Sequence, residues 1–179
     1  MKSILISLVI ILIFQSAVAQ EKADSLWNVW NNGQIEDTTR VDALIKLIEI
    51  ELLKTDPDSV FTLSNVGLEM INHEVEIKRV ERLMRFKGIS LGIRGFNKES
   101  IAVFEKNKAY CEQFGYVPGV VFNMSNIAQI YSDLGSFSKS LDLYLTAIEL
   151  YQEIDDANGL STCYNNIGIL YDCLGNSQQ

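Results

Sequence analysis

The sequence contains few residues that break a helix. Only two prolines, Pro57 and Pro118, occur in 179 residues, although 47% of the residues are hydrophobic. Proline interrupts helices, so its scarcity favours long helical segments. The hydrophobic and charged fractions are those of an ordinary folded protein, and the length allows one domain or a short repeat array.

Histidine and cysteine are also scarce, and their spacing suits neither a metal site nor a disulfide. His73 is the only histidine, and the three cysteines, Cys111, Cys163 and Cys173, form no CxxC pair. A zinc site is therefore excluded, and we expect no cofactor. Cys163 and Cys173 lie ten residues apart on one expected helix, which separates them by about 15 Å, too far for a disulfide. We expect all three cysteines to be small buried hydrophobic residues.

Motifs that carry catalysis are absent from the sequence. It has no glycine-rich phosphate loop, no HExxH and no GxSxG, and His73 has no catalytic partner at a plausible spacing. We therefore expect no enzyme activity in this segment and a non-catalytic His73 near a helix end. Basic residues are also outnumbered, 15 to 23 acidic ones, which excludes nucleic acid as a partner because phosphate binding needs a basic surface. The acidity serves solubility.

The first nineteen residues resemble an export signal. Lys2 precedes an apolar run from Ile4 to Phe14, and Ala17-Val18-Ala19 gives the small-residue pattern of a cleavage site. The apolar run is shorter than the ~20 residues of a membrane span, and no cysteine follows it to carry a lipid. We expect a signal peptide over 1–19, a mature chain of formal charge −9 with 14 basic and 23 acidic residues, and a periplasmic or other extracytoplasmic location.

The rest of the chain repeats itself every 40 residues. The segment NIAQIYSDLGS begins at Asn126, and the similar NIGILYDCLGN begins at Asn166. The same offset continues backwards. It aligns Gly88 with Ala128 and Gly168, Gly95 with Gly135 and Gly175, and Ser100 with Ser140.

Each repeat contains two amphipathic helices. Apolar residues follow the spacing i, i+3, i+4, i+7, which gathers side chains on one face of an α-helix. The two stripes are Met124, Ile127, Ala128, Tyr131, Leu134 and Leu141, Tyr144, Leu145, Ile148, Tyr151. Gly95, Gly135 and Gly175 are placed to end the first helix in a left-handed cap. Small residues at 88, 128, 168, 100 and 140 mark close helix contacts. The fold class expected is all-α, a solenoid of stacked antiparallel helical hairpins.

These residues resemble the tetratricopeptide repeat. The small, aromatic and glycine positions of that repeat are matched in order by Ala128, Tyr131, Gly135, Ser140, Tyr144 and Ala147. The period of 40 in place of 34, and Met124 or Tyr164 where tryptophan is usual, are departures typical of a longer-helix variant. The resemblance implies a superhelix that binds a protein or peptide. It covers 82–179 well, with the last repeat truncated.

Residues 40–81 resemble the repeat more loosely. A first helix is expected over Arg40–Lys54 and a second from Asp58, after Pro57. At an offset of 41, Val60, Leu63, Gly67 and Met70 align with Ile101, Phe104, Lys108 and Cys111, so one residue gained is expected here. Residues 20–39 are expected to cap the array, with Leu26, Trp27 and Trp30 in a short helix; a ligand box built from the two tryptophans is the alternative.

The resemblance also implies a binding groove along the first helices of successive hairpins. The residues expected to line it are Arg82, Arg85, Ser125, Asn126, Gln129, Asn165, Asn166 and Ile169. Asparagine and glutamine both donate and accept hydrogen bonds, which suits the backbone of an extended peptide; a solvated polar helix face is the alternative. The lysines and arginines of carboxylate-clamping relatives are missing from the last two repeats. Arg82 and Arg85 are expected to attract an acidic segment, and Asp155 and Asp156 only to solvate a turn.

The sequence also resembles the N-terminal repeat regions of Bacteroidota signalling proteins. The segments that carry this resemblance are LWNVWN, DPDS and CYNNIGILYDCLGN. In these proteins the repeats precede an adenylate/guanylate cyclase, a histidine kinase or a DNA-binding effector, so a binding region of a longer sensor is expected, with contact to a membrane only through a downstream span. The chain ends at Gln179 in mid-repeat, which makes self-association through the uncovered face a further expectation. The alternatives are a stand-alone exported assembly factor and an outer-membrane glycan-binding protein.

Overall fold

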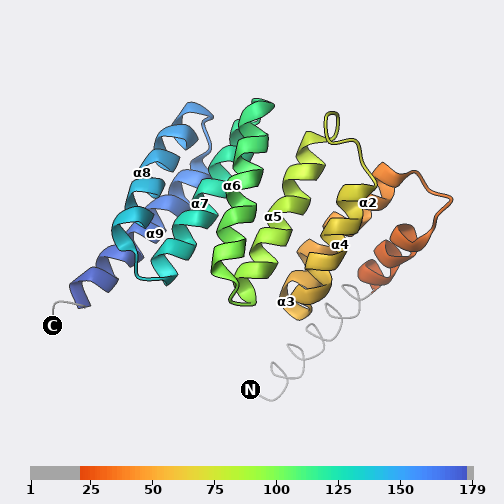
Figure 1. Ribbon diagram of the computed structural model, residues 1–179, viewed down its shortest axis with the longest axis horizontal. Coiled ribbons are helices and arrows are strands. Elements are labelled where there is room, and N and C mark those ends of the chain that lie inside the picture. The colour runs from red at the N-terminus through yellow and green to blue at the C-terminus, as the bar shows by residue number, and fades with distance from the viewer. Residues whose placement is uncertain (1–20, 177–179) are drawn as a thin grey trace, which may run out of the picture.

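The computed structural model describes residues 21–176, and the described part is helical throughout, without a strand. The signal peptide expected over 1–19 lies outside it. A helix over 21–31 comes first. The helices that follow are α2 (Asp37–Leu47), the π-helical η1 (Ile48–Leu52), α3 (Leu53–Thr55), α4 (Pro57–Glu69), α5 (Ile77–Ile93), α6 (Asn97–Gln113), α7 (Val117–Asp133), α8 (Phe137–Glu153) and α9 (Ala157–Asn176). They stack side by side in chain order as one elongated array (Figure 1). The all-α solenoid of hairpins is confirmed.

The repeat holds one register along the whole described array. First helices α2, α5, α7 and α9 begin at 37, 77, 117 and 157, and second helices α4, α6 and α8 begin at 57, 97 and 137. Burial follows the same offset of 40. In α4, Val60, Ser64 and Gly67 are buried, where α6 buries Ser100, Phe104 and Asn107. The offset of 41 expected for this region is therefore wrong: matching by side-chain type slipped by one residue, because Ser64 and Gly67 occupy positions that hold larger residues in α6.

Glycine ends the first helix of two hairpins, as the sequence predicts. Gly95 and Gly135 have φ of 82° and 71°, and the residue after each donates its N–H back to the helix, Phe96 to Leu91 O at 2.9 Å and Ser136 to Tyr131 O at 2.8 Å. The cap expected at Gly175 is wrong, since α9 runs on to Asn176. In the other two hairpins a second helix packs back after the glycine, and no described helix does so after Gly175.

The first hairpin turns by another means. The helix continues from α2 through the π-helical η1 and α3 to Thr55, and Asp56 then caps α4 by accepting the N–H of Ser59 at 3.1 Å. Pro57 takes the first helical position, where its missing N–H costs nothing. The second helix therefore begins at Pro57, one residue before the expected Asp58.

Small residues lie where the two helices of a hairpin touch, as expected at positions 88, 128, 100 and 140. The expectation is wrong for Gly168, where an added Cβ would meet nothing within 4 Å. Ser100 Oγ donates to Gly88 O and Ser140 Oγ to Ala128 O, both at 2.7 Å. Both serines are fully buried. A Cβ at Gly88 would lie 2.7 Å from the Phe104 ring, so this contact requires glycine.

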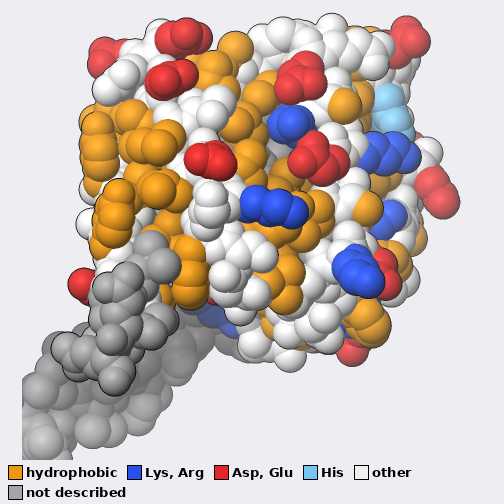
Figure 2. Space-filling view, turned by 60° about the vertical axis from the view of Figure 1, so that its left-hand side comes forward, with side chains coloured by type: hydrophobic (Ala, Val, Ile, Leu, Met, Phe, Trp, Pro, Cys, Tyr) orange, Lys and Arg blue, Asp and Glu red, His pale blue; other side chains and the backbone are white. Residues whose placement is uncertain are grey.

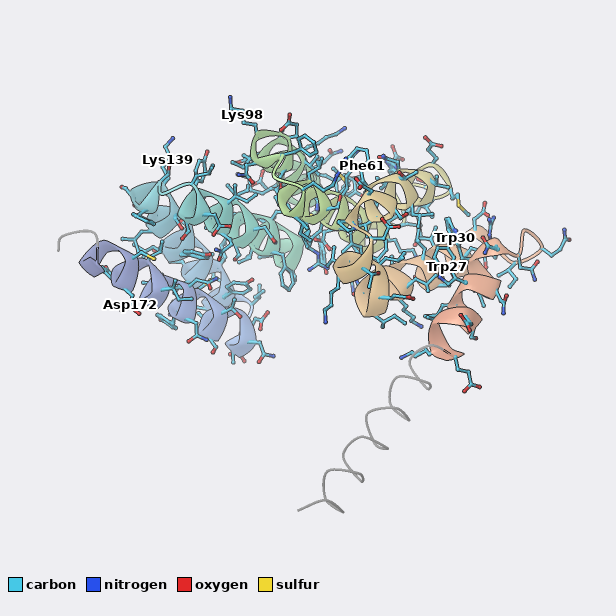
Figure 3. The ribbon with its side chains drawn as sticks, turned by 90° about the horizontal axis from the view of Figure 1, so that it is seen from below. Trp27, Trp30, Phe61, Lys98, Lys139 and Asp172 are labelled. Atoms are coloured by element: carbon cyan, nitrogen blue, oxygen red, sulfur yellow. The ribbon has the colours of Figure 1, made fainter. Side chains whose placement is uncertain are left out.

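The N-terminal end of the array is closed by the tryptophan segment. Trp30 is buried in one cluster with Val41 and Leu44, and Trp27 packs against that cluster. Arg40 stacks 5.5 Å over the Trp30 ring and donates to its carbonyl oxygen at 3.0 Å. Both tryptophans lie at this end of the molecule (Figure 3). These contacts are compatible with the capping role expected for this segment, which stays a prediction.

Two cysteines are buried as expected, and one is not. Cys111 and Cys163 are buried between helices, whereas Cys173 is exposed. The expectation was wrong for Cys173 because it lies near the end of α9, where no described helix covers it.

Hydrogen bonds between buried polar groups join three consecutive helices. Asn107 Nδ2 in α6 donates to Glu81 O in α5 at 3.0 Å and to Asn123 Oδ1 in α7 at 2.9 Å, and Asn123 Nδ2 donates to Gly119 O at 2.7 Å. Both asparagines are fully buried. Buried amides need such partners, so the bonds fix the position of α7 relative to α5.

No helix in the described residues is long and apolar enough to cross a membrane.

Candidate functional site

A cavity between α7 and α9 gathers half of the residues expected in the groove. Its volume is about 310 Å³. Ser125, Asn126 and Gln129 of α7 line it together with Asn166 of α9. The remaining lining residues, which the sequence did not indicate, are Phe122, Tyr151, Asp156, Asn158, Gly159 and Thr162. We call this cavity the α7–α9 groove.

Two aromatic rings line the α7–α9 groove. Tyr151 reaches it from α8 and is 2% exposed, and Phe122 meets its ring edge-to-face with centroids 6.4 Å apart. Gly159 lets α9 come this close, because a Cβ there would overlap the Tyr151 ring. The groove thus has an apolar floor beneath its polar rim.

The polar side chains of the groove are partly engaged with the protein itself. Asn126 Nδ2 donates to Phe122 O at 2.7 Å, which leaves its side-chain oxygen to accept another bond. Gln129 donates to Asp133 at 2.8 Å and accepts from the Tyr144 hydroxyl at 3.2 Å. These bonds fix the amide groups in place, and each amide keeps capacity for a ligand.

Burial raises the pKa values of two tyrosines and one cysteine around the groove. Burial raises the pKa of Tyr144 to about 12, against a hydrogen bond to Asn166 that lowers it. Burial likewise raises the pKa values of Tyr151 and Cys163, and a hydrogen bond to Ser125 opposes each shift. At neutral pH these hydroxyl and thiol groups carry no charge. The groove is therefore suited to binding by hydrogen bonds and apolar contact.

Asp156 is the one acidic residue that lines the groove, and it has a structural role. It accepts the backbone N–H groups of Asn158 at 3.1 Å and Gly159 at 3.0 Å, which caps α9. Its neighbour Asp155 makes the turn with φ of 54°, the left-handed conformation that Gly115 adopts one repeat earlier. The expectation that both residues only solvate the turn is therefore wrong.

The other expected groove residues lie elsewhere. Arg82 pairs with Glu49, and Arg85 lies 3.3 Å from Glu81 and stacks 4.7 Å over the Phe122 ring. Asn165 and Ile169 are on α9 but outside the groove lining, and Ile169 is 57% exposed. Attraction of an acidic segment by the two arginines would have to compete with their internal partners.

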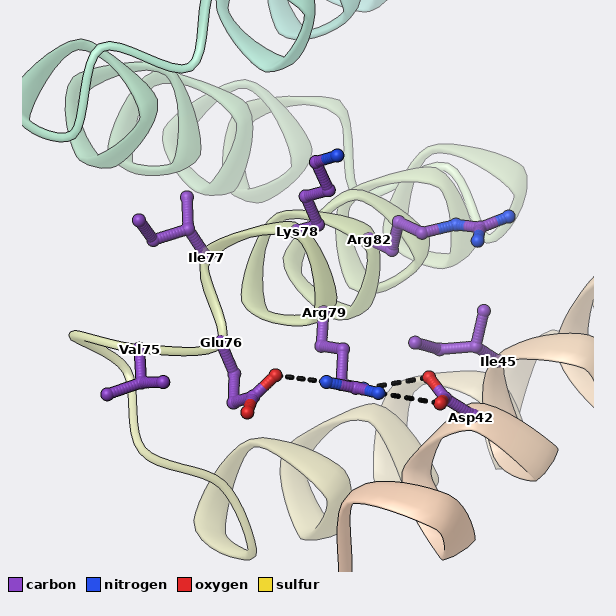
Figure 4. Close-up of a pocket in the computed structure, with 8 residues that line it drawn as sticks. All are labelled: Asp42, Ile45, Val75, Glu76, Ile77, Lys78, Arg79 and Arg82. Carbon is purple, nitrogen blue, oxygen red and sulfur yellow. Dashed lines mark hydrogen bonds and ion pairs between the residues drawn. The ribbon is translucent and has the colours of Figure 1, made fainter.

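A second cavity on the same series of helices lies between α2 and α5. It measures about 460 Å³, and Arg82 lines it beside Asp42, Ile45 and Arg79. Figure 4 shows Arg79 between two acids: it donates to Asp42 at 2.7 and 2.8 Å and pairs with Glu76. The hydrogen bond from Arg79 is the main reason that the pKa of Asp42 is lowered. Arg79 is therefore engaged by two acidic side chains, and Lys78 lines the same cavity.

In the described part of the chain, no cluster of three or more histidine, cysteine or acidic side chains is placed to hold a metal ion.

The described residues thus form a solenoid of helical hairpins with an amide-lined groove between α7 and α9. Residues 120–179 match a family model described as tetratricopeptide repeat. This segment includes α9 and nearly all of the α7–α8 hairpin, so the part that carries the groove is the part that matches.

Among solved structures, the fold resembles the crystal structure of BtubC (BKLC) from P. vanneervenii. The TM-score is 0.68 at 18% sequence identity, and the match covers 90% of this chain. The chain spans 66% of the length of that structure. At this identity the likeness concerns the fold alone. No curated protein matches the sequence.

Proposed function

We propose that the chain is a protein-interaction scaffold that holds an extended peptide segment in the α7–α9 groove. The observation that carries the proposal is the groove itself, in which Asn126, Gln129 and Asn166 surround an aromatic floor. An extended backbone presents alternating donors and acceptors, and side-chain amides satisfy both. The match of residues 120–179 to a tetratricopeptide repeat supports a binding role for this part.

The groove chemistry also narrows the kind of peptide. No lysine or arginine lines the α7–α9 groove, so we expect no clamp on a terminal carboxylate. The Phe122 and Tyr151 rings instead suit an apolar side chain of the peptide, flanked by backbone bonded to the amides. The expected ligand is an internal segment with at least one apolar residue.

The test begins with selection of peptides from a displayed library and continues with calorimetry. The double substitution of Asn126 and Asn166 by alanine should lower the affinity for the selected peptide by up to about two orders of magnitude. Each lost hydrogen bond costs about 0.5 to 1.5 kcal/mol. Asn165→Ala is the matched control, because Asn165 adjoins Asn166 but lies outside the lining.

Melting temperatures must accompany the calorimetry, because Asn166 also bonds the buried Tyr144 hydroxyl. Equal affinity for the double variant and the wild type would refute peptide binding through these amides. Weakening by Asn165→Ala to the same degree would place recognition outside the groove.

We further propose that the scaffold is the extracytoplasmic binding region of a longer signalling protein. The leader pattern over 1–19 and the resemblance to cyclase- and kinase-linked repeat proteins support this role. Fusion of residues 1–19 to alkaline phosphatase, which is active only outside the bacterial cytoplasm, tests the export. An inactive fusion would contradict the extracytoplasmic location.

A further inference from the structure

The face of α5 that is turned away from Arg82 and Arg85 carries a second kind of cavity. Val80, Met84 and Lys87 of α5 fall on one side of the helix, about half a turn from the two arginines. With Leu68 of α4 and residues of α6 they enclose about 170 Å³. The full lining is Leu68, His73, Val80, Met84, Lys87, Val103, Lys106 and Tyr110. We call it the α4–α6 pocket.

The same cavity recurs one repeat later, which shows that the fold itself produces it. A cavity of about 450 Å³ is lined by Val120, Met124, Thr146 and Leu150. These residues lie 40 positions after Val80, Met84, Lys106 and Tyr110. Both cavities thus lie over a first helix, between the second helices on either side of it.

The two cavities differ in charge. At the positions of Lys87 and Lys106 the later repeat has Ile127, which is buried, and Thr146. The later cavity does contain Lys108, but that residue is paired with Glu105 at 3.1 Å. The two lysines of the α4–α6 pocket are therefore not required by the fold.

Neither of these lysines has an acidic partner among the described residues. Lys87 Nζ donates to the neutral Asn65 Oδ1 at 2.7 Å and lies 5.0 Å from the centroid of the Phe61 ring. Burial lowers the pKa of Lys87, and the nearby charge of Lys106 lowers it further. Two like charges beside one apolar cavity repel each other, and an anion between them would remove that repulsion.

We propose that the α4–α6 pocket binds a small carboxylate that carries a short apolar group. Lys87 and Lys106 would hold the carboxylate by charge-assisted hydrogen bonds, and Leu68, Val80 and Met84 would surround the apolar group. A dry cavity of about 150 Å³ is enough for benzene, so the volume of about 170 Å³ suits a ring or a chain of about six carbons. The volume fits a free carboxylic acid of this size without further contacts.

Methionine methyl NMR on the full chain tests the proposal with an internal control. Met84 lines the α4–α6 pocket and Met124 lines its counterpart one repeat later. Titration with hexanoate should shift the Met84 methyl signal to saturation and leave the Met124 signal in place. Hexanol, which has the same chain without the charge, should leave Met84 unsaturated at the same concentrations.

Matched lysine variants complete the test. Lys106→Thr, which installs the residue of the later repeat, should weaken hexanoate binding about tenfold or more, and Lys87→Met should do the same. Lys98→Thr is the control, because Lys98 lies in α6 like Lys106 but projects from the outer edge of the molecule (Figure 3) and does not line the pocket. Equal responses of Met84 to hexanoate and hexanol, or an unaltered affinity of Lys106→Thr, would overturn the proposal. A response only to a peptide with a free leucine C-terminus would overturn the choice of a free acid.

Discussion

Two glycines at equivalent positions of the repeat should respond differently to the same substitution. Gly88 in α5 and Gly168 in α9 lie two repeats apart. A Cβ at Gly88 would meet the Phe104 ring at 2.7 Å, whereas a Cβ at Gly168 would find nothing within 4 Å. The substitution to alanine therefore compares a packed hairpin with an uncovered helix.

The magnitudes follow from two opposing effects. Alanine in a helix interior stabilises by about 0.5 to 1 kcal/mol relative to glycine, which is the whole effect expected for Gly168→Ala. At Gly88 the extra methyl displaces Phe104, which is 1% exposed and cannot move into solvent. Such overpacking costs about 1 to 3 kcal/mol. Gly88→Ala should therefore be less stable than Gly168→Ala by about 1 to 3 kcal/mol.

Urea unfolding of the two variants and the wild type, followed by circular dichroism, measures this difference. We expect Gly168→Ala to unfold at a higher urea concentration than the wild type and Gly88→Ala at a lower one than Gly168→Ala. Equal stabilisation of both variants would refute the close contact of α5 with α6 at Gly88. Destabilisation by Gly168→Ala would show that its face of α9 is covered.

Two further substitutions probe the core. Ala128→Leu should destabilise the fold by about 1 to 3 kcal/mol, because Ala128 is fully buried and its carbonyl accepts a hydrogen bond from Ser140. The melting temperature should fall by about 2 to 4 °C per kcal/mol. An unchanged melting temperature would show that the contact is loose. Glu81 is 1% exposed, and its burial raises its pKa in spite of the opposing charge of Arg85. The folded chain therefore binds this proton more tightly than the unfolded chain, so the stability is greatest below the ordinary pKa of glutamate and falls as the pH rises through the raised value. Glu81→Gln should melt higher than the wild type at pH 7 and equally at pH 4, whereas a lower melting temperature at pH 7 would mean that the pair with Arg85 outweighs the burial.

The sequence predicted the parts of the fold that depend on local chemistry. Gly95 and Gly135 could be identified because a left-handed cap needs glycine, and Ser100 and Ser140 because a small residue must face a neighbouring helix. Gly175 has the same sequence context, yet its turn depends on a following helix that packs back. The prediction of a cap at Gly175 was wrong because packing against a neighbouring helix, and not the residue type alone, decides the conformation.

The candidate site was only partly visible in the sequence for a similar reason. Polar residues on the first helices indicated Asn126 and Asn166, but Tyr151 reaches the groove from a second helix, and Asp156 reaches it from a turn. Their positions depend on how closely α9 approaches α8, which Gly159 permits. The 40-residue register could have indicated Phe122 and Thr162 as groove residues, since they occupy the position of Arg82 in the next two repeats.

Three large apolar side chains of α9 are exposed outside the groove. Tyr164, Ile169 and Tyr171 are 56%, 57% and 59% exposed. Figure 2, with the α8–α9 end of the molecule turned forward, shows hydrophobic side chains gathered on this part of the surface. Self-association through this face stays a prediction, and sedimentation at increasing concentration would measure it.

Site-specific crosslinking shows whether a peptide lies in the α7–α9 groove. A photoreactive benzoylphenylalanine at Thr162, which lines the groove, should crosslink the selected peptide in high yield. The same group at Asn165, less than one turn further along α9 and outside the lining, should give little product. Equal yields at the two positions, or crosslinking at 165 alone, would contradict peptide binding in the α7–α9 groove.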